Sequence, residues 1–225
     1  MGRAEGLRAM AAATLVATGA LATMMAPARA QGIVGYPAQV EAYDPREVAL
    51  LPRYCIYTQS FRDHVPGGSD KTAIDGWYAR LGPTFHALHH FCWGIMKTNR
   101  AMLLAADRQT RDFYLSAANA DFDYVIERAP EDFILLPEIL AKKGENLIRA
   151  GKGPLGMIEL ERAAALKPDY WPPYAYMSDY YRDLGDQAKA REVLQAGLRL
   201  MPESQGLRTR LAELDSVSKR KKNTR

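Results

Sequence analysis

The sequence predicts an all-α protein made of stacked antiparallel helical hairpins and closed by a capping C-terminal helix. Two prolines, Pro168 and Pro202, lie 34 residues apart, and small and large residues recur at matching distances before each of them. A helix ends at each proline because proline cannot donate the next helical hydrogen bond. Gly151 and Gly185 fall at the corners between helices, where glycine supplies the left-handed or unhindered conformation that a tight turn needs.

Residues 1–30 have the features of a cleaved secretory signal peptide. Arg3 and Arg8 precede an apolar stretch that runs from about Met10 to Met25, and Ala28 and Ala30 offer the small side chains that a signal peptidase reads. We therefore expect a periplasmic or secreted protein. An uncleaved membrane anchor is the alternative, although a span needs about 20 apolar residues and this stretch is shorter, so stable membrane insertion is not expected.

Residues 31–84 do not follow the repeat pattern and are expected to form an N-terminal extension that covers the first hairpin. Asp44 and Pro45 predict the N-cap and first residue of a short helix through Leu51. A glycine-rich loop carrying His64 follows. A further one or two helical turns are expected over 74–81. The same extension could instead occupy the groove in which a ligand would bind.

Residues 85–130 are expected to form a degenerate first hairpin. Its first helix should run from Pro83 to about Ala105. Four residues of its second helix stand at the offsets of the next repeat, namely Ala118, Phe122, Val125 and Pro130. The 38 residues from Pro130 to Pro168 imply a four-residue insertion in the connection 131–136.

Residues 137–170 and 171–204 form the two regular repeats. Gly144 and Ser178 are small where the second helix of each hairpin crosses, and the larger residues fill the seam, so each helix pair is held in one register. The matching pairs are Leu140 and Tyr174, Leu147 and Tyr181, Gly156 and Ala190, Leu160 and Leu194, and Ala163 and Gly197.

With these residues and this period, the chain resembles a tetratricopeptide-repeat protein over roughly residues 137–215. The resemblance implies a right-handed solenoid whose first helices line a concave face that binds protein partners. Chaperone-tail binders of that family hold a terminal carboxylate with a lysine and asparagine clamp. Ala141, Glu145 and Tyr176 stand at the corresponding places, so this ligand class is not carried over.

The chain ends in a predicted capping helix and a basic tail. Residues 205–217 place Leu207, Leu211 and Leu214 on one helical face, as expected of the cap of a stacked array. Residues 218–225 are expected to be disordered and carry five basic residues and no acidic one. The whole chain has a net charge of +4, so without this tail and the basic signal peptide the body of the chain is slightly acidic. This argues against a nucleic acid partner. A solubilising end is one interpretation of the tail, and weak contact with anionic lipid or acidic polysaccharide is the other.

The two cysteines and four histidines all lie between positions 55 and 92. In an exported chain Cys55 and Cys92 are expected to pair in a disulfide. The competing prediction is a copper or zinc site, because His86 and His90 lie one turn apart on a helix. His89 lies beside this pair, and His64, Cys55 or Met96 would supply further ligands. Packing of these histidines on a partly buried helix is the third interpretation.

The sequence contains no recognisable catalytic constellation, phosphate-binding glycine loop or redox pair, so it favours a binding module over an enzyme. We predict no cofactor for the adaptor interpretation and a protein partner in the cell envelope. A divergent enzyme with its site under the extension is the weakest alternative. The predicted partner-binding groove consists of Glu138, Lys142, Glu145, Arg149, Tyr176, Asp179, Arg182, Asp183 and Arg210.

Overall fold

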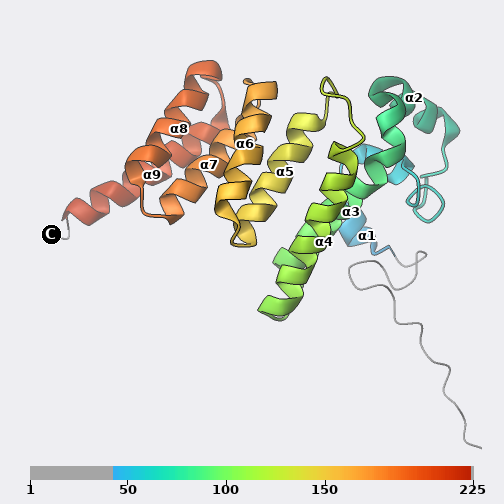
Figure 1. Ribbon diagram of the computed structural model, residues 1–225, viewed down its shortest axis with the longest axis horizontal. Coiled ribbons are helices and arrows are strands. Elements are labelled where there is room, and N and C mark those ends of the chain that lie inside the picture. The colour runs from blue at the N-terminus through green and yellow to red at the C-terminus, as the bar shows by residue number, and fades with distance from the viewer. Residues whose placement is uncertain (1–42, 224–225) are drawn as a thin grey trace, which may run out of the picture. The chain divides into compact units, whose positions relative to one another are not determined.

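A computed structural model describes residues 43–223, with side chains placed through residue 216. The predicted signal peptide, the first part of the extension and the side chains of the basic tail lie outside the described residues. All regular elements between residues 43 and 223 are helices, which confirms the all-α prediction (Figure 1). None of the helices described is long and apolar enough to cross a membrane.

The extension consists of short elements held against the first hairpin. Asp44 caps the first helix as predicted, but that helix is shorter than expected and ends at Val48. Glu47 on it accepts two hydrogen bonds, of 2.5 and 2.7 Å, from the Arg100 guanidinium of the first hairpin. The elements of the extension are α1 (Pro45–Val48), the 3-10 helix η2 (Arg53–Tyr57), α2 (Lys71–Leu81) and the 3-10 helix η3 (Gly82–Ala87).

The first hairpin pairs α3 (Leu88–Leu103) with α4 (Arg108–Ile126). The single helix expected from Pro83 to about Ala105 is divided, because the chain between Gly82 and Ala87 forms the tighter η3 turn before α3 begins. Asp107 caps α4 through a 2.7 Å bond from the Thr110 amide. The two helices approach closely where Gly94 faces the ring of Phe122.

The two regular hairpins are α5 (Leu136–Arg149) with α6 (Gly153–Leu166) and α7 (Trp171–Asp183) with α8 (Gln187–Leu200). Gly151 and Gly185 have φ angles of +76° and +85°, which confirms their predicted role at the corners. A Cβ atom on Gly144 would lie 2.8 Å from the carbonyl oxygen of Gly156. The small residues of the repeat pattern therefore set how closely α5 and α6 pack.

The hairpins stack in sequence order, and their first helices also touch each other. α5 contacts α7, and α7 contacts the last helix α9 (Gln205–Asn223), so these three helices share one face of the stack (Figure 1). Leu207 and Leu214 of α9 are buried, as the predicted cap requires.

The predicted helix end at residue 217 is wrong, since α9 continues to Asn223, and residues 218–223 are helical where a disordered tail was predicted. No glycine or proline interrupts the chain after Gly206. Lysine and arginine are good helix formers and suit a helix C-terminus.

Candidate functional site

The face shared by α5, α7 and α9 contains a cavity of about 250 Å³. Each of these helices contributes charged or tyrosine side chains at helical spacing, so that one face of each points into the same space. Seven of the nine residues predicted for the partner-binding groove line this cavity, namely Glu145, Arg149, Tyr176, Asp179, Arg182, Asp183 and Arg210. Glu138 and Lys142 lie on the same helix as Glu145, nearer its start.

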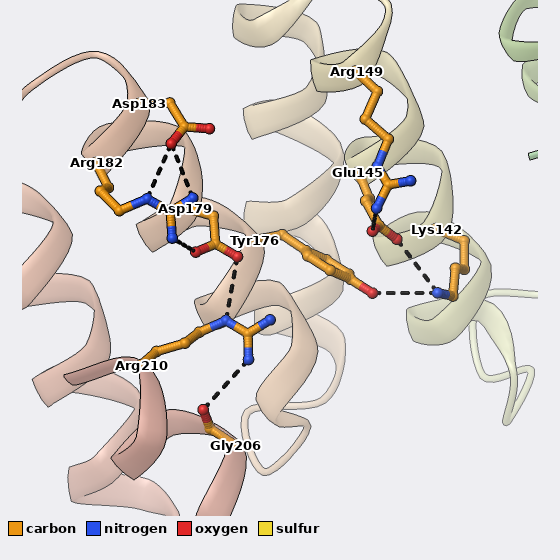
Figure 2. Close-up of polar contacts among 9 residues, drawn as sticks. All are labelled: Lys142, Glu145, Arg149, Tyr176, Asp179, Arg182, Asp183, Gly206 and Arg210. Carbon is orange, nitrogen blue, oxygen red and sulfur yellow. Dashed lines mark hydrogen bonds and ion pairs between the residues drawn. The ribbon is translucent and has the colours of Figure 1, made fainter. Parts of the chain in front are cut away.

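On α5 the charged residues form a ladder of ion pairs (Figure 2). Lys142 Nζ lies 3.3 Å from one oxygen of Glu145, and Arg149 Nη2 lies 2.5 Å from the other. Lys142 also donates a 3.2 Å hydrogen bond to the Tyr176 hydroxyl of α7. This bond connects the first helices of successive hairpins across the groove.

A second set of ion pairs connects α7 to α9 (Figure 2). The Arg182 guanidinium contacts Asp179 at 2.6 Å and Asp183 at 2.9 Å. The other oxygen of Asp179 lies 3.2 Å from Arg210 Nε. Arg210 also donates a 3.4 Å bond to the carbonyl oxygen of Gly206 within α9. Asp179 therefore holds two arginines from different helices at one wall of the cavity.

Burial shifts the pKa values of the groups at the end of the groove near the start of α5. It raises the pKa of Glu138, and the positive charges of Lys142 and Lys167 only partly oppose this effect. Burial likewise raises the pKa of Tyr176, followed by repulsion from Glu145. Tyr54 of η2 is buried, and the negative charge of Glu138 contributes to its raised pKa. The extension therefore reaches close to the start of α5.

Beside this groove lies a second cavity of about 190 Å³ that shares Asp179, Arg182 and Arg210 with it. The Oε1 atom of Gln187, which lines this cavity, is buried and accepts no hydrogen bond within the described part of the chain.

Two residues of the main cavity, Ile148 and Tyr180, are not among the nine residues predicted for the groove. They lie three and four residues after Glu145 and Tyr176, a spacing that places them on the same helical faces.

Cys55 and Cys92 form a disulfide, with sulfur atoms 2.09 Å apart. The bond ties η2 to the second turn of α3, and both side chains are fully buried. Because its sulfur is bonded to Cys55, Cys92 is not present as a thiolate that could bind a metal.

The four histidines occupy different environments. His86 is exposed on η3, His89 is buried on α3, and its Nδ1 atom lies 2.9 Å from the carbonyl oxygen of His86. His90 Nδ1 lies 2.8 Å from Asp121 of α4. His64 lies beside the Tyr43 ring. Within residues 43–216 no three His, Cys, Asp or Glu side chains are grouped to hold a metal ion.

A buried charge cluster at the centre of the first hairpin has no counterpart in the predictions. Lys97 and Asp121 have side chains only 2% and 4% exposed, and their charged atoms lie 2.5 Å apart. Asp121 thus contacts both side chains, His90 through one carboxylate oxygen and Lys97 through the other. The sequence carries no local signal for this cluster because its members lie on different helices.

Comparison of the chain with protein families, curated proteins and solved structures finds no match.

Proposed function

We propose that this chain is an exported scaffold or adaptor of the tetratricopeptide-repeat type, which binds a protein partner in a cell-envelope assembly or secretion process. The partner would place an extended or helical segment in the groove between α5, α7 and α9. The observation that carries the proposal is the convergence of charged and tyrosine side chains from three helices on one cavity of about 250 Å³.

The charge pattern of the groove indicates how a partner would be selected. Its nine predicted residues include four basic and four acidic side chains. Most of these charged side chains form ion pairs with one another. A partner segment gains binding only if its own charges replace these pairs at matching positions. Such surfaces provide specificity and orientation more than affinity.

Tyrosine supplies the apolar part of the same surface. Tyr176 and Tyr180 are half-buried and line the cavity. Tyrosine is enriched at the energetically important centres of protein interfaces because it combines a large apolar ring with a polar hydroxyl. The groove therefore combines apolar anchor positions with a ring of charges that sets the register.

Export is supported by the disulfide as well as by the resemblance of residues 1–30 to a signal peptide. Disulfides persist in oxidising compartments such as the periplasm and are rare in the cytosol. The buried Cys55–Cys92 bond fits that environment.

Site-specific photo-crosslinking in intact cells tests the proposal. A benzoylphenylalanine residue replaces Asp183, which lines the cavity and has a side chain 67% exposed. The matched control carries it at Glu161, an exposed residue of α6. We expect a discrete crosslinked product from position 183 that position 161 does not give. The same products from both positions, or none from position 183, would contradict a partner-binding groove.

A further inference from the structure

A separate cavity of about 490 Å³ lies on the first hairpin, apart from the predicted groove, and its lining includes His86 and His89 of the predicted metal site. Its volume falls in the range of sites that bind small ligands or chain ends. Its walls come from the loop after η2, from η3, from the start of α3 and from the end of α4. The lining residues are Gln59, Pro83, Thr84, His86, Ala87, His89, Tyr124, Arg128 and Pro130.

Arg128 provides the positive charge of this cavity. Its guanidinium carbon lies 3.6 Å from the centre of the Tyr124 ring, and the His90 ring stacks on Tyr124 at 3.7 Å. Two planar groups at these distances must occupy opposite faces of one ring. Nη1 donates a 2.9 Å bond to the carbonyl oxygen of Tyr124 and lies 3.6 Å from a Glu127 oxygen. Stacking and hydrogen bonding together hold the guanidinium at the cavity wall.

The other edge of this guanidinium is available to a ligand. Nε and Nη2 of Arg128 make no hydrogen bond with any described residue. This edge presents two parallel N–H groups, which is the geometry that binds a carboxylate through both oxygens. No acidic side chain lines the cavity to compete for it.

His89 provides an acceptor in the same wall. Its side chain is buried, and burial together with the neighbouring His90 lowers its pKa to about 4, so the ring is neutral at pH 7. Nδ1 must carry the proton, because it faces the carbonyl oxygen of His86 and a carbonyl can only accept. Nε2 therefore presents a lone pair, and it makes no hydrogen bond within the described residues.

Thr84 adds a third polar group without a partner. The residue is only 7% exposed and lines the cavity, and its hydroxyl forms no hydrogen bond with another described residue. The cavity is thus lined by two kinds of donor, the N–H groups of Arg128 and the hydroxyl of Thr84, and by one acceptor, Nε2 of His89.

From this arrangement we propose that the cavity binds a carboxylate that carries an N–H or O–H donor close to it. The carboxylate would bind the open edge of Arg128 and accept from the Thr84 hydroxyl, and the ligand's donor would bind His89 Nε2. A protein C-terminus and a free hydroxy acid both have this chemistry. The site is independent of the groove between α5, α7 and α9, so failure of one proposal leaves the other standing.

The disulfide holds one wall of this site. Gln59 lies four residues after Cys55, and the bond to Cys92 fixes that loop against α3, which carries His89. Ser60, next to Gln59, has a φ angle of +70°, a conformation that is costly for a residue other than glycine. Such strain is often found at binding sites.

Calorimetric titration of the oxidised mature protein with three compounds tests the proposal. The probes are N-acetylglycylphenylalanine, the same dipeptide with a C-terminal carboxamide, and 3-phenyllactate. We expect the free dipeptide or the hydroxy acid to bind about tenfold or more tightly than the carboxamide, since hydrogen bonds to charged groups are the stronger class. Tighter binding of the dipeptide would identify a protein C-terminus as the ligand, and tighter binding of 3-phenyllactate would identify a free hydroxy acid. Equal binding of the carboxamide, or no binding of any probe at millimolar concentration, would overturn the proposal.

Substitutions then locate the site. Arg128→Gln should weaken binding of the preferred carboxylate about tenfold, and Arg128→Lys should give an intermediate affinity because lysine keeps the charge but loses the paired N–H edge. Arg162→Gln is the matched control, since Arg162 is exposed on α6 and lines no cavity described above. The His89 Nε2 resonance should shift in ¹⁵N spectra on ligand addition. Unchanged affinity in Arg128→Gln, or equal losses in both glutamine variants, would contradict the assignment.

Discussion

Lys142 Nζ donates a 3.2 Å hydrogen bond to the hydroxyl of Tyr176, and the two residues are separated by 34 positions. This separation equals the distance between Pro168 and Pro202, so equivalent positions of successive hairpins contact each other directly. The contact explains why residues selected by their repeat offset gather on one face. A period in the sequence becomes a row of neighbours in space because each hairpin repeats the orientation of the one before.

Replacing Gly144 with alanine should destabilise the protein by about 1–3 kcal/mol through overpacking. The new Cβ would meet Leu160 Cγ at 2.7 Å and the Gly156 carbonyl oxygen at 2.8 Å. Gly76→Ala is the control, because a Cβ there meets nothing within 4 Å in helix α2. The control should stabilise by about 0.5–1 kcal/mol. Urea unfolding measures both, and equal effects would contradict close packing of α5 on α6.

Loss of the Cys55–Cys92 bond should cost about 4 kcal/mol of unfolding free energy, because the bond closes a loop between residues 37 positions apart. Denaturant unfolding of the oxidised protein and of a Cys55→Ser, Cys92→Ser double variant measures this difference. The variant should also bind the carboxylate probes more weakly, since Gln59 is no longer held against α3. A variant with the same unfolding free energy as the oxidised protein would contradict a stabilising role for the disulfide.

Asp121→Leu should destabilise the protein by about 3–5 kcal/mol, because it removes the carboxylate that pairs with the buried Lys97 ammonium. Lys97→Met should also destabilise the protein, because the buried Asp121 carboxylate then keeps His90 but loses its ammonium partner. The double variant Lys97→Met, Asp121→Leu should recover much of the loss, since apolar replacement of a buried ion pair is often tolerated. Thermal unfolding of all four proteins forms a double-mutant cycle. Additive losses would contradict a coupled pair.

Protonation of His89 should destabilise the folded protein in acid. Its pKa falls from the usual value near 6.5 to about 4 in the folded state. Above pH 6.5 His89 is neutral in both states and its contribution is fully present. As the pH falls from 6.5 toward 4 the unfolded chain binds a proton that the folded chain does not, so up to about 3 kcal/mol is lost.

The pH dependence of unfolding in the wild type and in His89→Gln measures this contribution. The variant should lack the part of the acid destabilisation that lies between pH 6.5 and 4. Identical pH profiles for the two proteins would show that His89 titrates normally in the folded state.

The hairpins and the groove could be predicted because their signals are local and repeated. Gly144, Gly151 and the closing prolines recur at one period, and helical spacing then identifies which residues share a face. For the cavity that contains Arg128, the sequence singled out His86 and His89 but neither Thr84 nor Arg128, because its walls come from segments that only the fold and the disulfide bring together. The buried Lys97–Asp121 pair was missed for the same reason, since it joins two helices of a hairpin with degenerate spacing.

The most direct test of the partner-binding groove is photo-crosslinking from position 183 in a chain whose α5 ladder is inverted. The substitutions Lys142→Glu, Glu145→Lys and Arg149→Glu reverse every charge of the ladder and keep each neighbouring pair opposite in sign. We expect a protein that still unfolds cooperatively on heating, and loss of the crosslinked product that the wild-type ladder gives. A product of undiminished yield in the inverted, folded protein would contradict the claim that this groove selects the partner.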